Sequence, residues 1–88
     1  MPNPQPLVPM KHSIESAYCF FHQKWRVYQY SNSPQQKEEI EYAIASYVET
    51  MNSELFAQLA CGRTDFLLSH TTFPKDIVAA VNKLEAML

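Results

Sequence analysis

The stretch over residues 35–61 contains neither glycine nor proline, and helix-terminating signals flank it on both sides. Before it, the Ser33 hydroxyl can cap free backbone amides, Pro34 suits the first position of a helix, and Gln36 can complete a capping box with Ser33. After it, Gly62 readily adopts the left-handed conformation that ends many helices. We therefore predict one long helix between these two signals, against which the other elements must pack.

Three further segments favour a helix. After Ser13, which can act as an N-cap, apolar side chains recur at the helical spacing, and a last helix begins near Thr72 with Pro74 in its first turn. Thr64 and Asp65 start a short helical turn, for which a brief strand is the alternative. The sequence thus predicts helical segments at about residues 13–30, 34–61, 65–69 and 73–88.

Each of the longer helices carries one apolar face, which we expect to line the core. These inner residues are Ile14, Ala17, Tyr18, Phe21, Trp25 and Tyr28, then Ile40, Ile44, Tyr47, Val48, Met51, Leu55 and Leu59, and finally Phe73, Ile77, Ala80, Val81, Leu84 and Leu88. Short connections make consecutive helices antiparallel. We expect an all-α fold, an antiparallel three-helix bundle with a short extra helical turn between helices 2 and 3. The short-long-short order also occurs in histone-like handshake dimers, but the first helix is long and the net charge of −2 does not suit a DNA spool.

The beginning of the chain differs in composition from the rest. Residues 1–12 contain four prolines, a spacing that predicts an extended tail with polyproline II tendency. The bundle domain is then residues 13–88, roughly 75 residues, a size at which a single core is usually marginal. A second subunit would add burial, so the size favours a homo-oligomer.

Composition excludes several classes of function. With one glycine, the chain holds no dinucleotide fingerprint, phosphate loop or nucleophile elbow, each of which needs glycines close together. No apolar run approaches the roughly 18 residues that span a bilayer, and no secretory signal precedes the first helix. Two cysteines do not make a disulfide framework. We expect a cytoplasmic protein with no membrane contact, no cofactor and no small-molecule substrate.

Four apolar residues fall outside the inner faces. Phe20 and Val27 are seven residues apart on the first helix and lie more than about 100° from the centre of its apolar stripe. Tyr42 and Phe56 raise the same question on the second helix. Either these side chains complete a wide core, or they form an apolar contact surface for a second molecule.

A mixture of basic and aromatic residues on the first helix suggests a second possible function. Such mixtures can bind single-stranded nucleic acid, whose bases stack on rings and whose phosphates pair with cations. Trp25 and Tyr28 belong to the inner face, however, and the chain is acidic overall, so we expect nucleic-acid binding only as the alternative. Its contact residues would be Lys11, His22, Lys24 and Arg26.

Thiols and imidazoles give no convincing site. Cys19, His22, Cys61 and His70 could in principle hold zinc, but their spacing matches no paired-ligand signature. Cys61 lies at a predicted helix C-terminus, where the dipole disfavours a thiolate nucleophile. We therefore predict no metal and no enzyme. Arg63 fits a structural corner after the helix better than an anion site.

The sequence thus favours a small non-enzymatic helical protein-interaction module that self-associates as a dimer, with another protein as the alternative partner. Its expected interface residues are Phe20, Val27, Tyr42 and Phe56.

Overall fold

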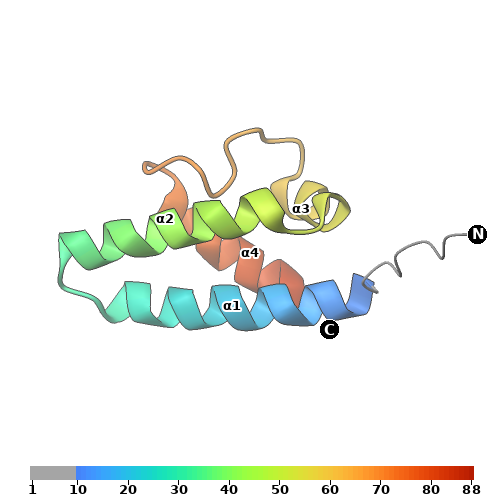
Figure 1. Ribbon diagram of the computed structural model, residues 1–88, viewed down its shortest axis with the longest axis horizontal. Helices are drawn as coiled ribbons and strands as arrows, with labels where there is room; N and C mark the ends of the chain where they lie inside the picture. Colours follow the sequence, from blue (N-terminus) through green and yellow to red (C-terminus); the bar gives the residue numbers. More distant parts are fainter. Residues whose placement is uncertain (1–9) are drawn as a thin grey trace, which may run out of the picture.

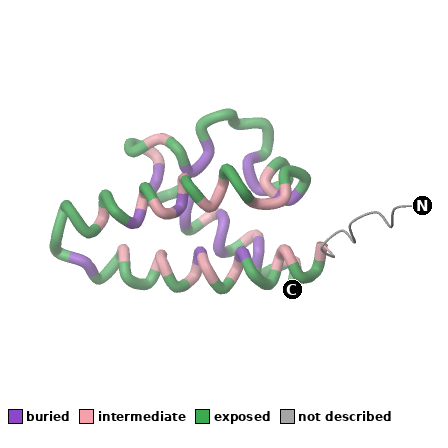
Figure 2. Tube along the Cα trace, in the orientation of Figure 1, coloured by how far each residue is buried: buried purple, intermediate pink, exposed green. Residues whose placement is uncertain are grey.

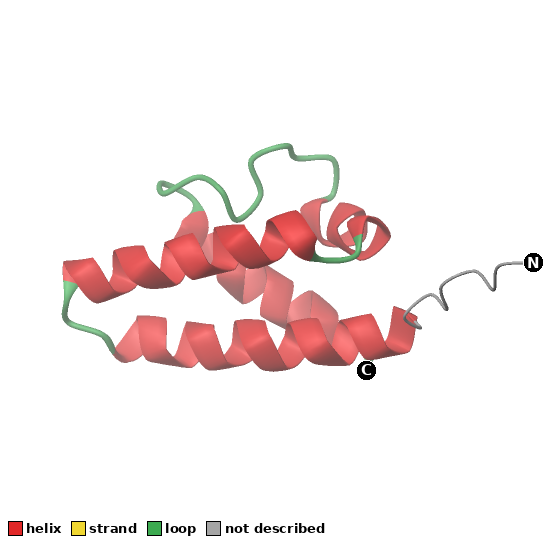
Figure 3. Ribbon diagram, viewed as in Figure 1, coloured by secondary structure: helices red, strands yellow, loops and turns green. Residues whose placement is uncertain are grey.

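The computed structural model describes residues 10–88, and this part of the chain is all-α. Four helices follow one another (Figure 1): α1 (Met10–Tyr30), α2 (Pro34–Thr50), α3 (Ser53–Ala60) and α4 (Phe73–Met87). Within residues 10–88 no strand is present, and only loops and turns connect the helices (Figure 3). The all-α prediction is confirmed, but the three long helices of the expected bundle are replaced by four helices of unequal length.

The helices form two layers. α1 and α2 run antiparallel and side by side, joined by the short turn at residues 31–33 (Figure 1). In this view α4 crosses behind them, and no other helix of residues 10–88 lies in front of the pair. The most extensive contact between helices joins α1 and α4, and α3 packs against both of these helices at the end of α2. One face of the α1–α2 hairpin is thereby left without a covering helix.

The core lies between the hairpin, α3 and α4 (Figure 2). Most of the predicted inner residues are buried or half-buried, which confirms the assignment of the three apolar faces. Leu88 is an exception, because it is 59% exposed at the end of α4. Two loop residues, Phe66 and Leu67, add to the core. The fully buried large side chains are Phe21, Ile44, Leu55, Leu59, Leu67, Phe73, Ile77 and Leu84.

The long helix predicted over residues 34–61 is divided. Met51 and Asn52 have extended backbones, with ψ of 168° and 121°, so the helix ends at Thr50 and restarts at Ser53. The cause is the Asn52 side chain, whose Oδ1 accepts hydrogen bonds from the N–H groups of Glu54 at 2.9 Å and Leu55 at 3.0 Å. Asparagine in this role favours a helix start over a helix interior. The division also removes the long central helix on which the histone-like alternative depended.

Two predicted helix starts have different outcomes. α1 begins at Met10 and not at Ser13, so residues 10–12 of the predicted tail are helical, and residues 1–9 lie outside the described chain. Ser33 caps α2 as predicted, accepting from the Gln36 N–H at 3.2 Å. The Gln36 side chain does not return to the Ser33 amide. Instead, Ser31 Oγ accepts from the Ser33 N–H at 3.2 Å and contacts Gln36 Oε1 at 2.6 Å, so Ser31 stands between the two members of the capping box.

The short helix predicted at residues 65–69 is a single turn. The carbonyl of Asp65 accepts from the N–H groups of Leu68 at 2.9 Å and Ser69 at 3.2 Å. The backbone cannot continue as a helix because Leu67 has a positive φ of 65°. The helical stop before this loop is confirmed, since Cys61 and Gly62 both adopt left-handed backbones, with φ of 52° and 85°. In residues 10–88 no helix is long and apolar enough to cross a membrane.

Candidate interaction surface

A stacked pair of rings bridges the two helices of the hairpin. The rings of Phe20 on α1 and Tyr47 on α2 have centroids 4.4 Å apart and planes 13° apart. Both residues are half-buried, and the Lys24 ammonium lies 5.4 Å from the centre of the Phe20 ring. Burial is the main cause that raises the pKa of Tyr47, with a smaller effect from Cys19, so its hydroxyl stays protonated at neutral pH. This aromatic bridge leaves part of both rings available to a partner.

The two helices that carry the bridge also carry exposed apolar side chains. Val27 is 42% exposed and Tyr42 is 76% exposed. Because Phe20 faces Tyr47, these two residues lie at the same level along the hairpin. The two helices run in opposite directions and each rises about 1.5 Å per residue. Val27, seven residues after Phe20, is therefore level with Ile40, seven residues before Tyr47. Tyr42 therefore lies only about 3 Å along the axis from the level of Val27, on the neighbouring helix. We call Phe20, Val27, Tyr42 and Tyr47 the hairpin surface.

A shallow cavity of about 510 Å³ adjoins Val27 at the end of α1. Tyr30, which is 76% exposed, and Arg26 line it together with Val27. It extends the accessible apolar area toward the turn between the helices. Its full lining is His22, Gln23, Arg26, Val27, Tyr30, Ser31 and Gln36.

The four residues predicted as interface thus lie in two kinds of environment. Phe20 contacts Tyr47, and Phe56 on α3 packs with its ring centre 6.1 Å from that of Phe66, so both are covered in part within one subunit. Val27 and Tyr42 remain exposed. Phe20, Val27 and Tyr42 are assigned to the hairpin surface by their levels on α1 and α2, Phe56 on α3 is not, and Tyr47, which the sequence placed in the core, is added.

The two helices of the hairpin differ in charge. α1 carries three basic residues and one acidic residue, whereas α2 carries four acidic residues and one basic residue. Glutamates therefore flank Tyr42, while the cations lie on α1 beside Phe20 and Val27. The charged residues are Lys11, Lys24, Arg26 and Glu15 on α1, and Lys37, Glu38, Glu39, Glu41 and Glu49 on α2.

The residues predicted to contact nucleic acid differ in their surroundings. His22 and Arg26 line the shallow cavity, but Lys24 lies over the Phe20 ring and Lys11 is in the first turn of α1. The His22 ring also stacks on Tyr18, with centroids 5.3 Å apart, and is therefore engaged within the helix.

The four residues considered for zinc are likewise dispersed. Cys19 and Cys61 are exposed and carry free thiols. His70 bonds through Nδ1 to Glu41, with distances of 2.8 and 3.1 Å to the two carboxylate oxygens. Across residues 10–88, no group of three or more histidine, cysteine or acidic side chains is arranged to hold a metal ion.

The sequence analysis missed the cluster around Glu41, where α2 meets the loop before α4. Besides His70, the carboxylate accepts from the Tyr28 hydroxyl at 3.4 Å. The hydrogen bond that His70 donates to Glu41, and the negative charge of Glu41, raise the pKa of His70, whereas burial first and then Glu41 raise the pKa of Tyr28. His70 comes from a loop whose path the sequence did not define, so nothing in its spacing indicated Glu41 as a partner. The cluster borders a cavity of about 340 Å³.

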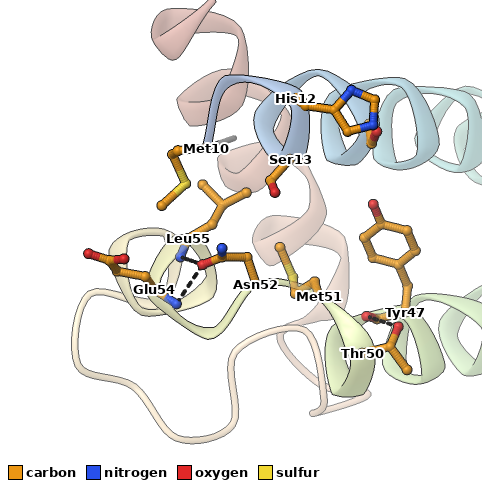
Figure 4. A pocket seen from close by; sticks show the side chains of 10 residues that line it. Met10, His12, Ser13, Tyr47, Thr50, Met51, Asn52, Glu54 and Leu55 are labelled. Carbon is orange, nitrogen blue, oxygen red and sulfur yellow. Dashed lines mark hydrogen bonds between the residues drawn. The ribbon is translucent and has the colours of Figure 1, made fainter. Parts of the chain in front are cut away.

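A larger groove of about 700 Å³ opens at the other end of the hairpin, between the start of α1 and the α2–α3 junction (Figure 4). Met10, Met51 and Leu55 supply its apolar wall. His12 and Glu54 lie far apart in Figure 4, so they do not form an acid–base pair across the groove. Asn52 is engaged in capping α3. The groove is therefore a feature of the helix junction, and its residues suggest no reaction.

Comparison with known proteins gives no further indication, because no family model, curated protein or solved structure matches the chain.

Proposed function

We propose that this protein is a small helical protein-interaction module, with no chemistry of its own, that self-associates as a two-fold dimer through the hairpin surface. The observation that carries the proposal is the exposure of Val27 and Tyr42, two apolar side chains at similar levels on the two helices that carry the half-buried Phe20–Tyr47 bridge. Exposed apolar area concentrated in this way, with polar residues around it, is typical of contact surfaces.

The charges of the hairpin support a second copy as the occupant. A two-fold axis parallel to the helices places α1 of each chain over α2 of its partner. The basic helix then meets the acidic helix twice in the same dimer, which stabilises this pairing and disfavours other registers. The uncovered faces of the two hairpins would then pack against each other, as two layers of two helices each.

The size of the core supports the same conclusion. A domain of about 75–80 residues buries a comparatively small share of its surface, and association adds burial without lengthening the chain. The two free, exposed thiols, Cys19 and Cys61, fit our proposal of a reducing compartment, the cytoplasm.

Sedimentation equilibrium tests the dimer. We expect the chain, of 10.2 kDa, to reach twice its mass as its concentration rises from about 1 to 100 μM, the range of modest protein–protein affinities. Val27→Glu should leave a monomer, because it places a charge in the contact. Val78→Glu is the matched control, since Val78 is 37% exposed on α4 and lies outside the hairpin surface. A wild-type chain that stays monomeric throughout would refute the proposal.

Charge exchange tests the orientation. Lys24→Glu and Glu39→Lys should each weaken the dimer, because each variant sets like charges against each other in both halves of a homodimer. Mixing the two variants should restore association, since the heterodimer regains opposite charges in both contacts. If the mixture associates no better than either variant alone, α1 does not lie over the partner's α2.

A further inference from the structure

The thiol of Cys61 and the amine of Lys83 are in direct contact. Nζ of Lys83, on α4, lies 2.6 Å from Sγ of Cys61, the C-cap residue of α3. The same Nζ donates to the carbonyl of Leu59 at 3.0 Å, so the end of α3 holds the amine in place. Cys61 is exposed, and dissolved oxidants can therefore reach its sulfur. Two reactive side chains from different helices thus share one accessible position.

The contact with Lys83 changes the expected reactivity of the Cys61 thiol. The C-terminal end of a helix carries partial negative charge, which opposes a thiolate. The Lys83 nitrogen lies directly at this sulfur, and the thiolate is the form of cysteine that reacts with peroxides. After oxidation, the same nitrogen is the nearest nucleophile to an electrophilic sulfur.

We propose that Lys83 captures oxidised Cys61 as a covalent sulfur–nitrogen link, a reversible sulfenamide between α3 and α4. In the first step the thiolate attacks one oxygen of hydrogen peroxide, hydroxide leaves, and two electrons pass from sulfur to peroxide, giving a sulfenic acid. In the second step the deprotonated Nζ attacks Sγ and the sulfenic hydroxyl leaves with one amine proton as water. The sum consumes a thiol, an amine and one peroxide, and releases two waters.

Cys19 provides an internal comparison. It is also exposed, on α1, but within residues 10–88 its sulfur has no hydrogen bond to a cationic side chain. Peroxide should therefore take Cys19 to an ordinary sulfenic acid, which remains open to trapping reagents. Among residues 10–88, Cys61 is the one cysteine with a lysine amine in direct contact with its sulfur.

Intact mass spectrometry of the full chain carrying Cys19→Ser tests the link. At about pH 9, peroxide should lower the mass by about 2 Da, and dithiothreitol should restore it. Peptide mapping should then join the peptides that contain Cys61 and Lys83. Thermal unfolding should occur at a higher temperature in the linked form, because the link ties residue 61 to residue 83 in the unfolded chain.

Lys83→Arg in the same background is the matched control. It keeps the positive charge but removes the nucleophilic amine, so Cys61 should accumulate as a sulfenic acid that dimedone traps. If the protein with Lys83 intact gains oxygen atoms without losing about 2 Da, the proposal is wrong. A gain of about 14 Da in a linked product would mean an oxygen-bridged link, and would also overturn the sulfur–nitrogen bond.

Discussion

The carboxylate of Asp76 on α4 receives both terminal nitrogens of Arg63, at 2.6 Å for Nη1 to Oδ1 and 3.2 Å for Nη2 to Oδ2. Oδ2 also accepts from the Leu67 N–H at 3.0 Å and from the Thr72 hydroxyl at 2.9 Å. Asp76 is only 3% exposed, and across residues 10–88 no buried side-chain nitrogen or oxygen is left without a partner. One carboxylate thus organises the whole loop between α3 and α4.

Asp76→Ala should lower the free energy of unfolding by about 2–4 kcal/mol, since it removes four hydrogen bonds and leaves buried donors unpaired. Urea denaturation with the circular dichroism signal of the helices would measure the change. Asp65→Ala is the control, because Asp65 bonds to the same arginine but its side chain is 58% exposed. An equal loss in both variants would mean that the burial of Asp76 does not matter.

The same residue gives the protein a dependence on acid. Burial alone would raise the pKa of Asp76, but the hydrogen bonds from Arg63, Leu67 and Thr72 outweigh burial and hold the pKa below its ordinary value. The contribution of Asp76 to the stability of the folded protein is therefore present above pH 3.8, the ordinary pKa of aspartate. It is lost as pH falls through the lower pKa that Asp76 has in the folded protein. Asp76→Ala should lack this part of the acid transition.

A second pH effect, of opposite sign, is expected from His70. Glu41 raises the pKa of His70. The contribution of this ion pair to the stability of the folded protein is therefore present below pH 6.5, the ordinary pKa of histidine, and is lost as pH rises through the pKa of His70 in the folded protein. The urea midpoint of His70→Ala should fall below that of the wild type at about pH 5.5, and the difference should disappear at about pH 8.5 and in high salt. His12→Ala, on the exposed side of α1, should match the wild type throughout. A difference that persists unchanged at pH 8.5 would contradict the ion pair.

Removal of the cap at Asn52 should loosen α3. Asn52→Ala should cost about 0.5–2 kcal/mol, because the N–H groups of Glu54 and Leu55 lose their acceptor. Asn52→Asp should retain nearly full stability, since aspartate caps as well as asparagine does. Hydrogen exchange of the α3 amides would locate the effect, and equal protection in the wild type and Asn52→Ala would show that α3 does not depend on its cap.

Local signals predicted much of the fold. Ser33, Pro34 and Gly62 mark helix ends because capping and backbone conformation depend on neighbouring residues alone, and the apolar stripes follow from helical spacing. The break at Asn52 also had a local signal, since Thr50, Asn52 and Ser53 all have modest helix propensity. The absence of glycine and proline from residues 35–61 led instead to the prediction of one continuous helix.

The contacts that define the loops could not be predicted in this way. Arg63 with Asp76, His70 with Glu41, and Cys61 with Lys83 each join residues whose separation depends on how α3 and the following loop dock. The same holds for the hairpin surface. Helical geometry placed Phe20 outside the apolar stripe, but only the position of α2 decides that Tyr47 covers one of its faces.

The two extended residues between α2 and α3 determine whether α3 packs into the core of its own subunit or of another. Leu55 and Leu59 are fully buried because the chain changes direction at Met51 and Asn52. A continuous helix over residues 34–61 would be about 42 Å long, whereas α1 is about 31 Å long, so it would carry Leu59 beyond the end of α1 and leave Leu55 at the level of its first turn. Any substitution that makes this joint helical therefore favours segment exchange, in which α3 of one chain fills the vacancy left in another.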